Sequence, residues 1–201
     1  MLTSSSSSAP RRMLKSSTNI GTLSELCQAH EIEYCDMMEE ILYFIKQTAA
    51  DDPRLPAHPT EVGLLPLKWF TQLQIPVSDF EEGDVFHIHQ AWCTGIKTFR
   101  NSSTRNDWVW VQTGREESYG DLRGRAVAQL SALFKIRNGL SQAAGVHQLA
   151  LVRILDPINS GQFHLASRHI RVSKLSTGRD MQIVSIGALI GQAHVIPSGE
   201  R

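Results

Sequence analysis

His87 and His89, followed by Cys93, are the residues whose types and spacing most suggest chemistry. In an extended strand, residues two positions apart point to the same side, so both imidazoles would face one ligand. Imidazole nitrogen and thiolate sulfur are ligands that zinc prefers. A fourth ligand is missing, and we favour two half-exposed strand histidines beside an ordinary buried cysteine. A metal-dependent enzyme built on these three residues is the third of our hypotheses.

A second group combines aromatic and basic side chains. Indole rings interleaved with guanidinium groups are used by grooves that bind single-stranded nucleic acid or peptides. A small sheet also buries its tryptophans, with arginines stacking at its edge. For each residue taken singly, a role in the core or at the sheet edge is the better explanation. For the whole cluster, the structural role and ligand binding are both retained. The candidate nucleic-acid-binding residues are Arg100, Arg105, Trp108, Trp110, Arg123, Arg125, Lys135 and Arg137.

Other catalytic patterns are missing from the sequence. The glycine-spaced segment 114–124 lacks the lysine and hydroxyl of a phosphate-binding loop, and no G-x-S-x-G nucleophile motif occurs. Paired carboxylates such as Glu81-Glu82 fall in turn-like segments, where solvated charge is the better explanation. We therefore expect no enzyme activity and no cofactor.

Opposite charges are concentrated in the two halves of the chain. Residues 1–96 carry 6 basic and 13 acidic side chains, and residues 97–201 carry 14 basic and 7 acidic ones. A basic half attracts polyanions, and it can equally dock on the acidic half of its own chain.

The local patterns predict helices first and strands afterwards. Thr22 and Glu25 have the spacing of a capping box, and apolar residues then recur at helical intervals up to residue 48. One helix over 22–48, or two pieces broken near His30, would fit. In the segment 126–136 every second residue is apolar, which predicts a long strand with one apolar face. The expected extended segments are residues 73–77, 85–89, 107–111, 126–136, 147–155, 169–175, 181–186 and 189–196.

These elements indicate an α+β, mainly β fold. We expect a small antiparallel barrel or sandwich of six to seven short strands, preceded by an acidic amphipathic helix. The predicted organisation is a disordered Ser-rich arm (1–20), an amphipathic helical segment (21–50), a Pro-rich connector (51–66) and a β-rich domain (67–201).

Composition narrows the setting. Of 201 residues, 41% are hydrophobic, which is enough for a core. No apolar run approaches the roughly 20 residues of a membrane span, so we expect no membrane partner. Three cysteines without a CxxC pair make a poor disulfide framework and indicate a reducing, intracellular compartment.

Several strings of the sequence, in order, carry a family resemblance. FTQLQIPVSDF, IHQAWCTG, RNDWVWVQ, YGDLRGRAVAQLSALFKIRN and GRDMQIVSIGALIGQAHVIPSGE together resemble the C-terminal region of fungal Plavaka-type transposase-like proteins, which are related to CACTA elements. The resemblance covers about residues 35–201. It implies that the catalytic carboxylates of such proteins lie upstream of this region, that the chain is a fragment, and that its setting is nuclear and DNA-associated. The composition alone would also fit the cytoplasm.

Two binding hypotheses lead. The first is a non-catalytic module, left over from a transposase-like protein, that contacts DNA or a transposase-related protein through the basic, Trp-containing surface between Arg100 and Arg137. The second is a structural or protein-interaction domain in which the acidic helix packs on the basic sheet and neutralises it.

Overall fold

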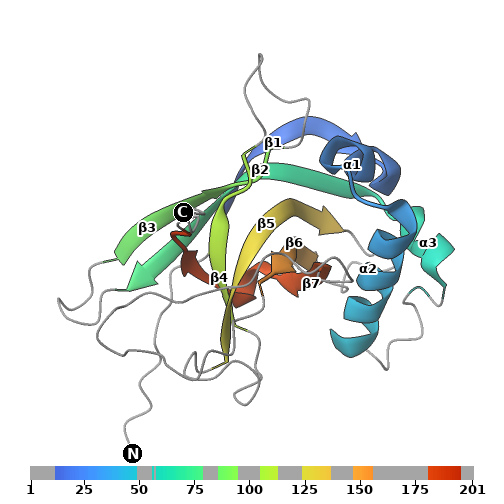
Figure 1. Ribbon diagram of the computed structural model, residues 1–201. Coiled ribbons are helices and arrows are strands. Elements are labelled where there is room, and N and C mark those ends of the chain that lie inside the picture. The colour runs from blue at the N-terminus through green and yellow to red at the C-terminus, as the bar shows by residue number, and fades with distance from the viewer. Residues whose placement is uncertain are drawn as a thin grey trace, which may run out of the picture.

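A computed structural model describes residues 12–48, 56, 58–78, 86–94, 105–112, 124–136, 147–155 and 181–195. Within these residues, eight strands form one antiparallel sheet and three α-helices lie beside it (Figure 1). The elements are β1 (Arg12–Gly21), α1 (Leu23–His30), α2 (Tyr34–Thr48), α3 (Pro59–Gly63), β2 (Leu67–Ser78), β3 (Phe86–Trp92), β4 (Trp108–Gln112), β5 (Arg125–Ile136), β6 (His147–Ile154), β7 (Met181–Ser185), the 3₁₀ turn η2 (Ile186–Ala188) and β8 (Leu189–Gln192).

Strands β2 and β5 organise the sheet because each pairs with three neighbours. β2 pairs with β1, with β5 through residues 67–70, and with β3 through residues 72–78. β5 also pairs with β4 and β6. Further out in the sheet, β6 pairs with β7 and β4 pairs with β8. In Figure 1, β1 and β2 arch over β5, β6 and β7, which shows how strongly the sheet is bent.

The predicted fold class, mainly β with helices before most of the strands, is confirmed. The described sheet is open, so the expected barrel or sandwich is only approximated, and it has eight strands instead of six or seven. The additional strand is β1, within the segment 1–20 that the Ser-rich composition predicts to be disordered. Its backbone pairs with β2 from Arg12 to Gly21, a long-range partner that composition does not reveal.

The helical segment follows the local signals closely. The Thr22 amide donates to Glu25 Oε2 at 2.9 Å, and the Glu25 amide donates to Thr22 Oγ1 at 3.3 Å, which completes the capping box. Glu31 adopts a left-handed conformation with φ of 52° and ends α1, so the break near His30 is confirmed. The connector 51–66 contains the short helix α3, which Pro59 can begin because a first-turn residue needs no amide donor.

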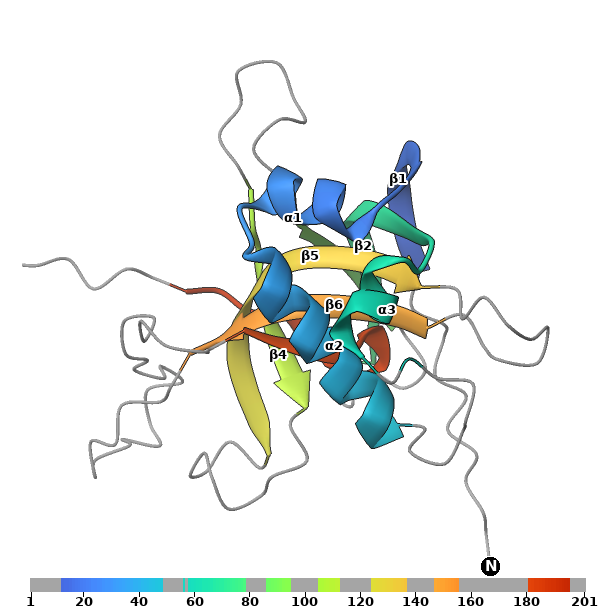
Figure 2. The same cartoon turned by 90° about the vertical axis from the view of Figure 1, so that its right-hand side faces the viewer.

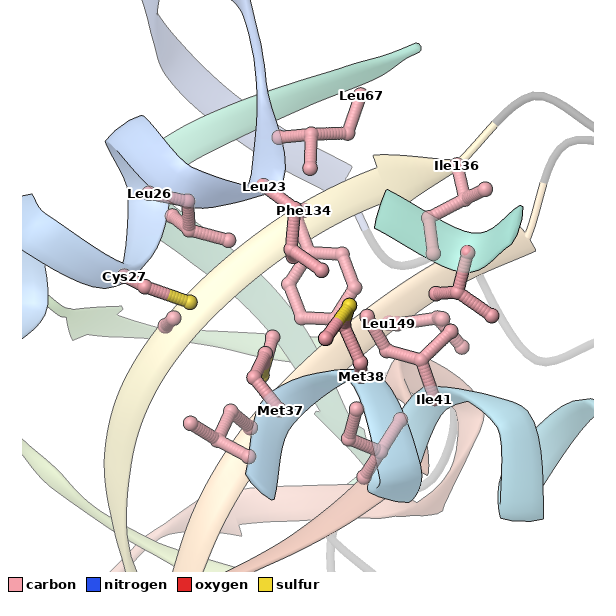
Figure 3. Packing of buried hydrophobic residues seen from close by; sticks show 14 of the residues in the cluster. Leu23, Leu26, Cys27, Met37, Met38, Ile41, Leu67, Phe134, Ile136 and Leu149 are labelled. Atoms are coloured by element: carbon pink, nitrogen blue, oxygen red, sulfur yellow. The ribbon is translucent and has the colours of Figure 1, made fainter. Parts of the chain in front are cut away.

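One core lies between the helices and the sheet. Figure 2 shows α2 and α3 crossing in front of β5 and β6, and Figure 3 shows apolar side chains of α1 and α2 meeting those of the strands around Phe134. We call it the helix-side core. Its buried members are Leu23, Leu26, Cys27, Met37, Met38, Ile41, Leu42, Ile45, Val62, Leu67, Ala132, Phe134, Ile136, Leu149, Leu151 and Ile183.

The carboxylates of α2 take no part in this core. Asp36 and Glu39 are exposed, so α2 docks on the sheet through its apolar stripe. Neither α2 nor any other helix of the described ranges is long and apolar enough to cross a membrane.

A second core fills the opposite face of the bent sheet. We call it the inner core. Its buried members are Phe70, Leu73, Ile75, Ala91, Cys93, Val109, Val111, Ala126, Ala128, Leu130, Leu133, Ala150, Val152, Ile154, Ile186 and Leu189. Because both faces of β5 and β6 are covered along much of their length, these strands read as nearly continuous apolar runs.

A β-bulge in β5 distributes its side chains between the two cores. The register with β6 shifts between Leu130 and Ala132, which leaves Ser131 as an extra residue. Leu130 therefore faces the inner core, whereas Ala132 and Phe134 face the helices. The long strand over 126–136 is confirmed, but the single apolar face predicted for it is wrong, because one inserted residue exchanges the two faces.

The bulge also touches α1. His30, in the last turn of α1, forms a hydrogen bond with the backbone of Ser131. Burial of the imidazole lowers the pKa of His30 from its ordinary 6.5, and this hydrogen bond opposes the change. The folded protein therefore favours the neutral form of His30 at the contact between helix and bulge.

We expect acid to weaken this contact. When the pH falls below 6.5, the unfolded chain binds a proton at His30 that the folded protein binds only at lower pH, so the free energy of unfolding decreases. In His30→Gln the amide can still donate to Ser131 but does not titrate. Urea unfolding at pH 7.5 and 5.5 should show a smaller loss in the variant than in the wild type. An equal loss in both proteins would contradict this role of His30.

The packing of α2 on the helix-side core predicts that substitutions at two nearby positions of this helix differ in their effect on stability. Ile41 is fully buried, whereas Tyr43 is 59% exposed. Ile41→Ala removes buried methyl groups and leaves a cavity, so it should cost about 2–5 kcal/mol of unfolding free energy. Tyr43→Ala should cost about 0.5 kcal/mol or less because the site faces water. Chemical denaturation measures both, and comparable losses would argue against the orientation of α2.

Candidate nucleic-acid interface

His87, His89 and Cys93 lie in three different environments in the structure. His87 lies exposed on β3. His89 Nδ1 accepts a hydrogen bond of 3.2 Å from the backbone amide of Gln192 on β8, and the buried Cys93 donates its thiol to the carbonyl of Phe70 at 3.5 Å. Over the described ranges, no three His, Cys, Asp or Glu side chains form a group that could hold a metal ion.

The contact of His89 has a structural role. β3 and β8 are not paired in a ladder, and the imidazole joins them across the opening of the sheet. The ring packs directly against β8 at Gly191, where even a Cβ would make only ordinary van der Waals contact with His89 Nδ1, at 3.4 Å. We call this contact the β3–β8 seam.

Burial controls the chemistry of two of the three cysteines. Desolvation raises the pKa of the Cys93 thiol well above its ordinary value, and it raises the pKa of Cys27 to about 11. Since the thiolate is the nucleophile, both side chains are poor reactants in the folded protein. Cys35 is exposed.

The predicted alternation in β4 is confirmed. Val109 and Val111 are fully buried in the inner core, so Trp108 and Trp110 project from the other side of the sheet. Both tryptophans are half-buried, and they pack with a small apolar cluster. Its other members are Val127, Leu155, Ala193 and Val195.

Two arginines share the side of the sheet on which the tryptophans lie. Arg125 on β5 is exposed and pairs in register with Gln112, two residues beyond Trp110. Arg153 on β6 is half-exposed and pairs with Gln129, which itself pairs with Trp108. We call these two arginines, the two tryptophans and their apolar cluster the outer face. The helix-side core covers a different part of the same side of β5 and β6.

Arg105 occupies the corner between β3 and β4. Its guanidinium group makes two hydrogen bonds with Asp107, of 2.8 and 3.1 Å, and lies 5.6 Å from the centre of the Trp92 ring. Asp107 also accepts a 3.0 Å hydrogen bond from the Trp92 amide, so the guanidinium is held in place. The hydrogen bonds to Asp107 raise the pKa of Arg105. The carboxylate cancels the net charge of Arg105, whose side chain remains 56% exposed.

The predicted set of basic residues does not form one surface. Lys135 lies between Phe134 and Ile136, which both face the helices, so its side chain projects from the opposite side of β5, away from the outer face. Arg100, Arg123 and Arg137 lie outside the described residues.

The described strands of the sheet carry charge of one sign only. Across the eight strands that the structure describes, the sequence contains no Asp and no Glu. The helices, in contrast, carry carboxylates in their first turns. The charged residues of the strands are Arg12, Lys15, Lys68, Arg125, Lys135 and Arg153.

Sequence reasoning missed Trp92 and Arg153. Arg153 lies in an apolar run of the sequence, and spacing alone does not identify the strands that pair with this run. Its position beside Gln129 and Trp108 therefore could not be predicted. The expected strands contain a single carboxylate, that of Asp107, and this imbalance was the available signal for the basic character of the sheet.

No protein-family model matches the chain, and no curated protein or solved structure is significantly similar to it. The chemistry of the outer face is therefore inferred from its own side chains.

The environments of the cysteines predict their reactivity. At pH 8, the thiol reagent DTNB should modify one residue of the native protein, Cys35, and all three in denaturant, because Cys27 and Cys93 are buried with raised pKa values. Absorbance at 412 nm counts the thiols that have reacted. Cys35→Ser should abolish the native signal. Fast modification of a second thiol in the native protein would contradict the assigned burial.

Proposed function

We propose that this domain is a non-catalytic binding module for single-stranded nucleic acid and that the outer face is its contact surface. The observation that carries the proposal is the combination of eight described strands without carboxylates with two half-buried tryptophans and two arginines on one side of the sheet. Indole rings stack on bases of any sequence, and arginines contact the phosphates between them.

The corner at Arg105 supports the same function. The guanidinium group, held near Trp92 by Asp107, offers an exposed planar surface on which a base can stack. Because its side chain is already ordered, little conformational entropy is lost when a ligand binds.

The resemblance to Plavaka-type transposase-like proteins supports an origin for such a module. We infer from it a nuclear protein whose partners are DNA or a transposase-related protein. The catalytic residues of that family are not among the motifs shared with this chain, which is consistent with a purely binding role.

A protein-interaction domain without nucleic-acid binding is the second candidate. The observation that favours it is the apolar cluster around Trp108 and Trp110, because aromatic side chains ringed by arginines are also typical of the centre of protein interfaces. The two functions differ in their dependence on salt, since phosphate contacts release counterions from the nucleic acid.

Fluorescence anisotropy with a labelled 15-nucleotide oligothymidine tests the proposal. The wild type should bind with a Kd of about 1–100 µM at low salt, and its affinity should fall steeply as salt increases. Arg125→Gln should weaken binding and reduce the salt slope by about 1, because one phosphate contact is lost. The matched control Lys46→Gln removes an exposed positive charge from α2 and should bind as the wild type does.

A tryptophan variant tests the stacking. Trp110→Ala should cost about 1–3 kcal/mol of binding free energy, while Trp110→Phe should keep part of it, because phenylalanine preserves an aromatic face. Absence of binding by the wild type at low salt, or equal binding by the Arg125→Gln and Lys46→Gln variants, would overturn the proposed function.

A further inference from the structure

Lys68, Lys135 and Gln148 form a row across three adjacent strands. Lys68 on β2 pairs in register with Lys135 on β5, which pairs with Gln148 on β6. Each of the three is adjacent in sequence to a residue of the helix-side core, so the row projects from the other side of the sheet. The row is therefore separate from the outer face.

The two lysines are held close together. The Lys68 ammonium lies 5.7 Å and the Lys135 ammonium 5.1 Å from the centre of the same ring, that of Phe70. Each gains a cation–π contact, but like charges directly opposite each other on neighbouring strands repel. The arrangement concentrates positive charge beside one buried aromatic side chain.

This charge has no acidic partner in the part of the chain that the structure describes. Neither lysine forms an ion pair there, and the three strands of the row contain no carboxylate. The Gln148 side chain is half-buried and, among the same residues, forms no hydrogen bond. Its amide NH₂ group places two further donors next to Lys135.

We propose that this row binds a phosphate group. Two ammonium groups and an amide donate to the oxygens of one tetrahedral dianion, which relieves the repulsion between Lys68 and Lys135. The phosphate comes either from the backbone of a nucleic acid or from a free phosphate or phosphorylated small molecule. The site does not depend on Trp110 or Arg125, so it stands or falls independently of the outer face.

A titration of the protein against inorganic phosphate, followed by ³¹P NMR at constant ionic strength, tests the site. The wild type should show a saturable shift change with a millimolar Kd. Lys68→Gln and Lys135→Gln should each raise that Kd at least fivefold, and Lys68→Arg should keep binding within about twofold, because the charge is retained. Lys46→Gln is the control, because it removes one exposed lysine charge elsewhere and should leave the titration unchanged.

Competition identifies the source of the phosphate. If oligothymidine displaces inorganic phosphate from the wild type and Lys68→Gln weakens oligothymidine binding, the site holds a backbone phosphate. If adenosine monophosphate displaces inorganic phosphate and oligothymidine does not, the site holds a small phosphorylated molecule. A linear, unsaturable response in the wild type, or equal Kd values for Lys68→Gln and Lys46→Gln, would overturn the site. Oligothymidine binding that is sensitive to Arg125→Gln would survive either of these failures.

Discussion

The extra residue in β5 is the constraint on which the rest of the architecture depends. If the strand alternated regularly, residues 126–136 would present one apolar face, and β5 could contribute to only one core. Ser131 exchanges the two sides halfway along the strand, so β5 supplies Leu130 to the inner core and Phe134 to the helix-side core. The bulge also bends the strand, and His30 ties it to α1.

Segregation of charge follows from the same layout. Helices α1, α2 and α3 carry carboxylates and dock by apolar contact, whereas every charged residue of the eight described strands is basic. The acidic helix therefore packs on the sheet, as expected from the sequence, but through Met37, Ile41 and Ile45. Asp36 and Glu39 of α2 face water, so the helix does not use these carboxylates to dock on the sheet.

Features that neighbouring residues determine could be predicted from the sequence, whereas features that depend on long-range strand pairing could not. The capping box at Thr22 and the alternation of Trp108 and Trp110 are set by neighbouring residues, and both were predicted correctly. β1 could not be predicted because its hydrogen bonds depend on β2, whose paired residues lie between 46 (Gly21 to Leu67) and 62 (Arg12 to Gln74) positions further along the chain. Lys135 was assigned to the wrong surface because one inserted residue reverses the meaning of sequence parity.

The seam between β3 and β8 has a consequence for the order of folding. Its hydrogen bond joins residues 103 positions apart, so most of the chain must be arranged before His89 meets the Gln192 amide. Closing such a long loop costs entropy that one hydrogen bond repays only when β4 already holds β8 in place. The last strand of the sheet is therefore expected to join late, after the bulged strand and its two cores have formed.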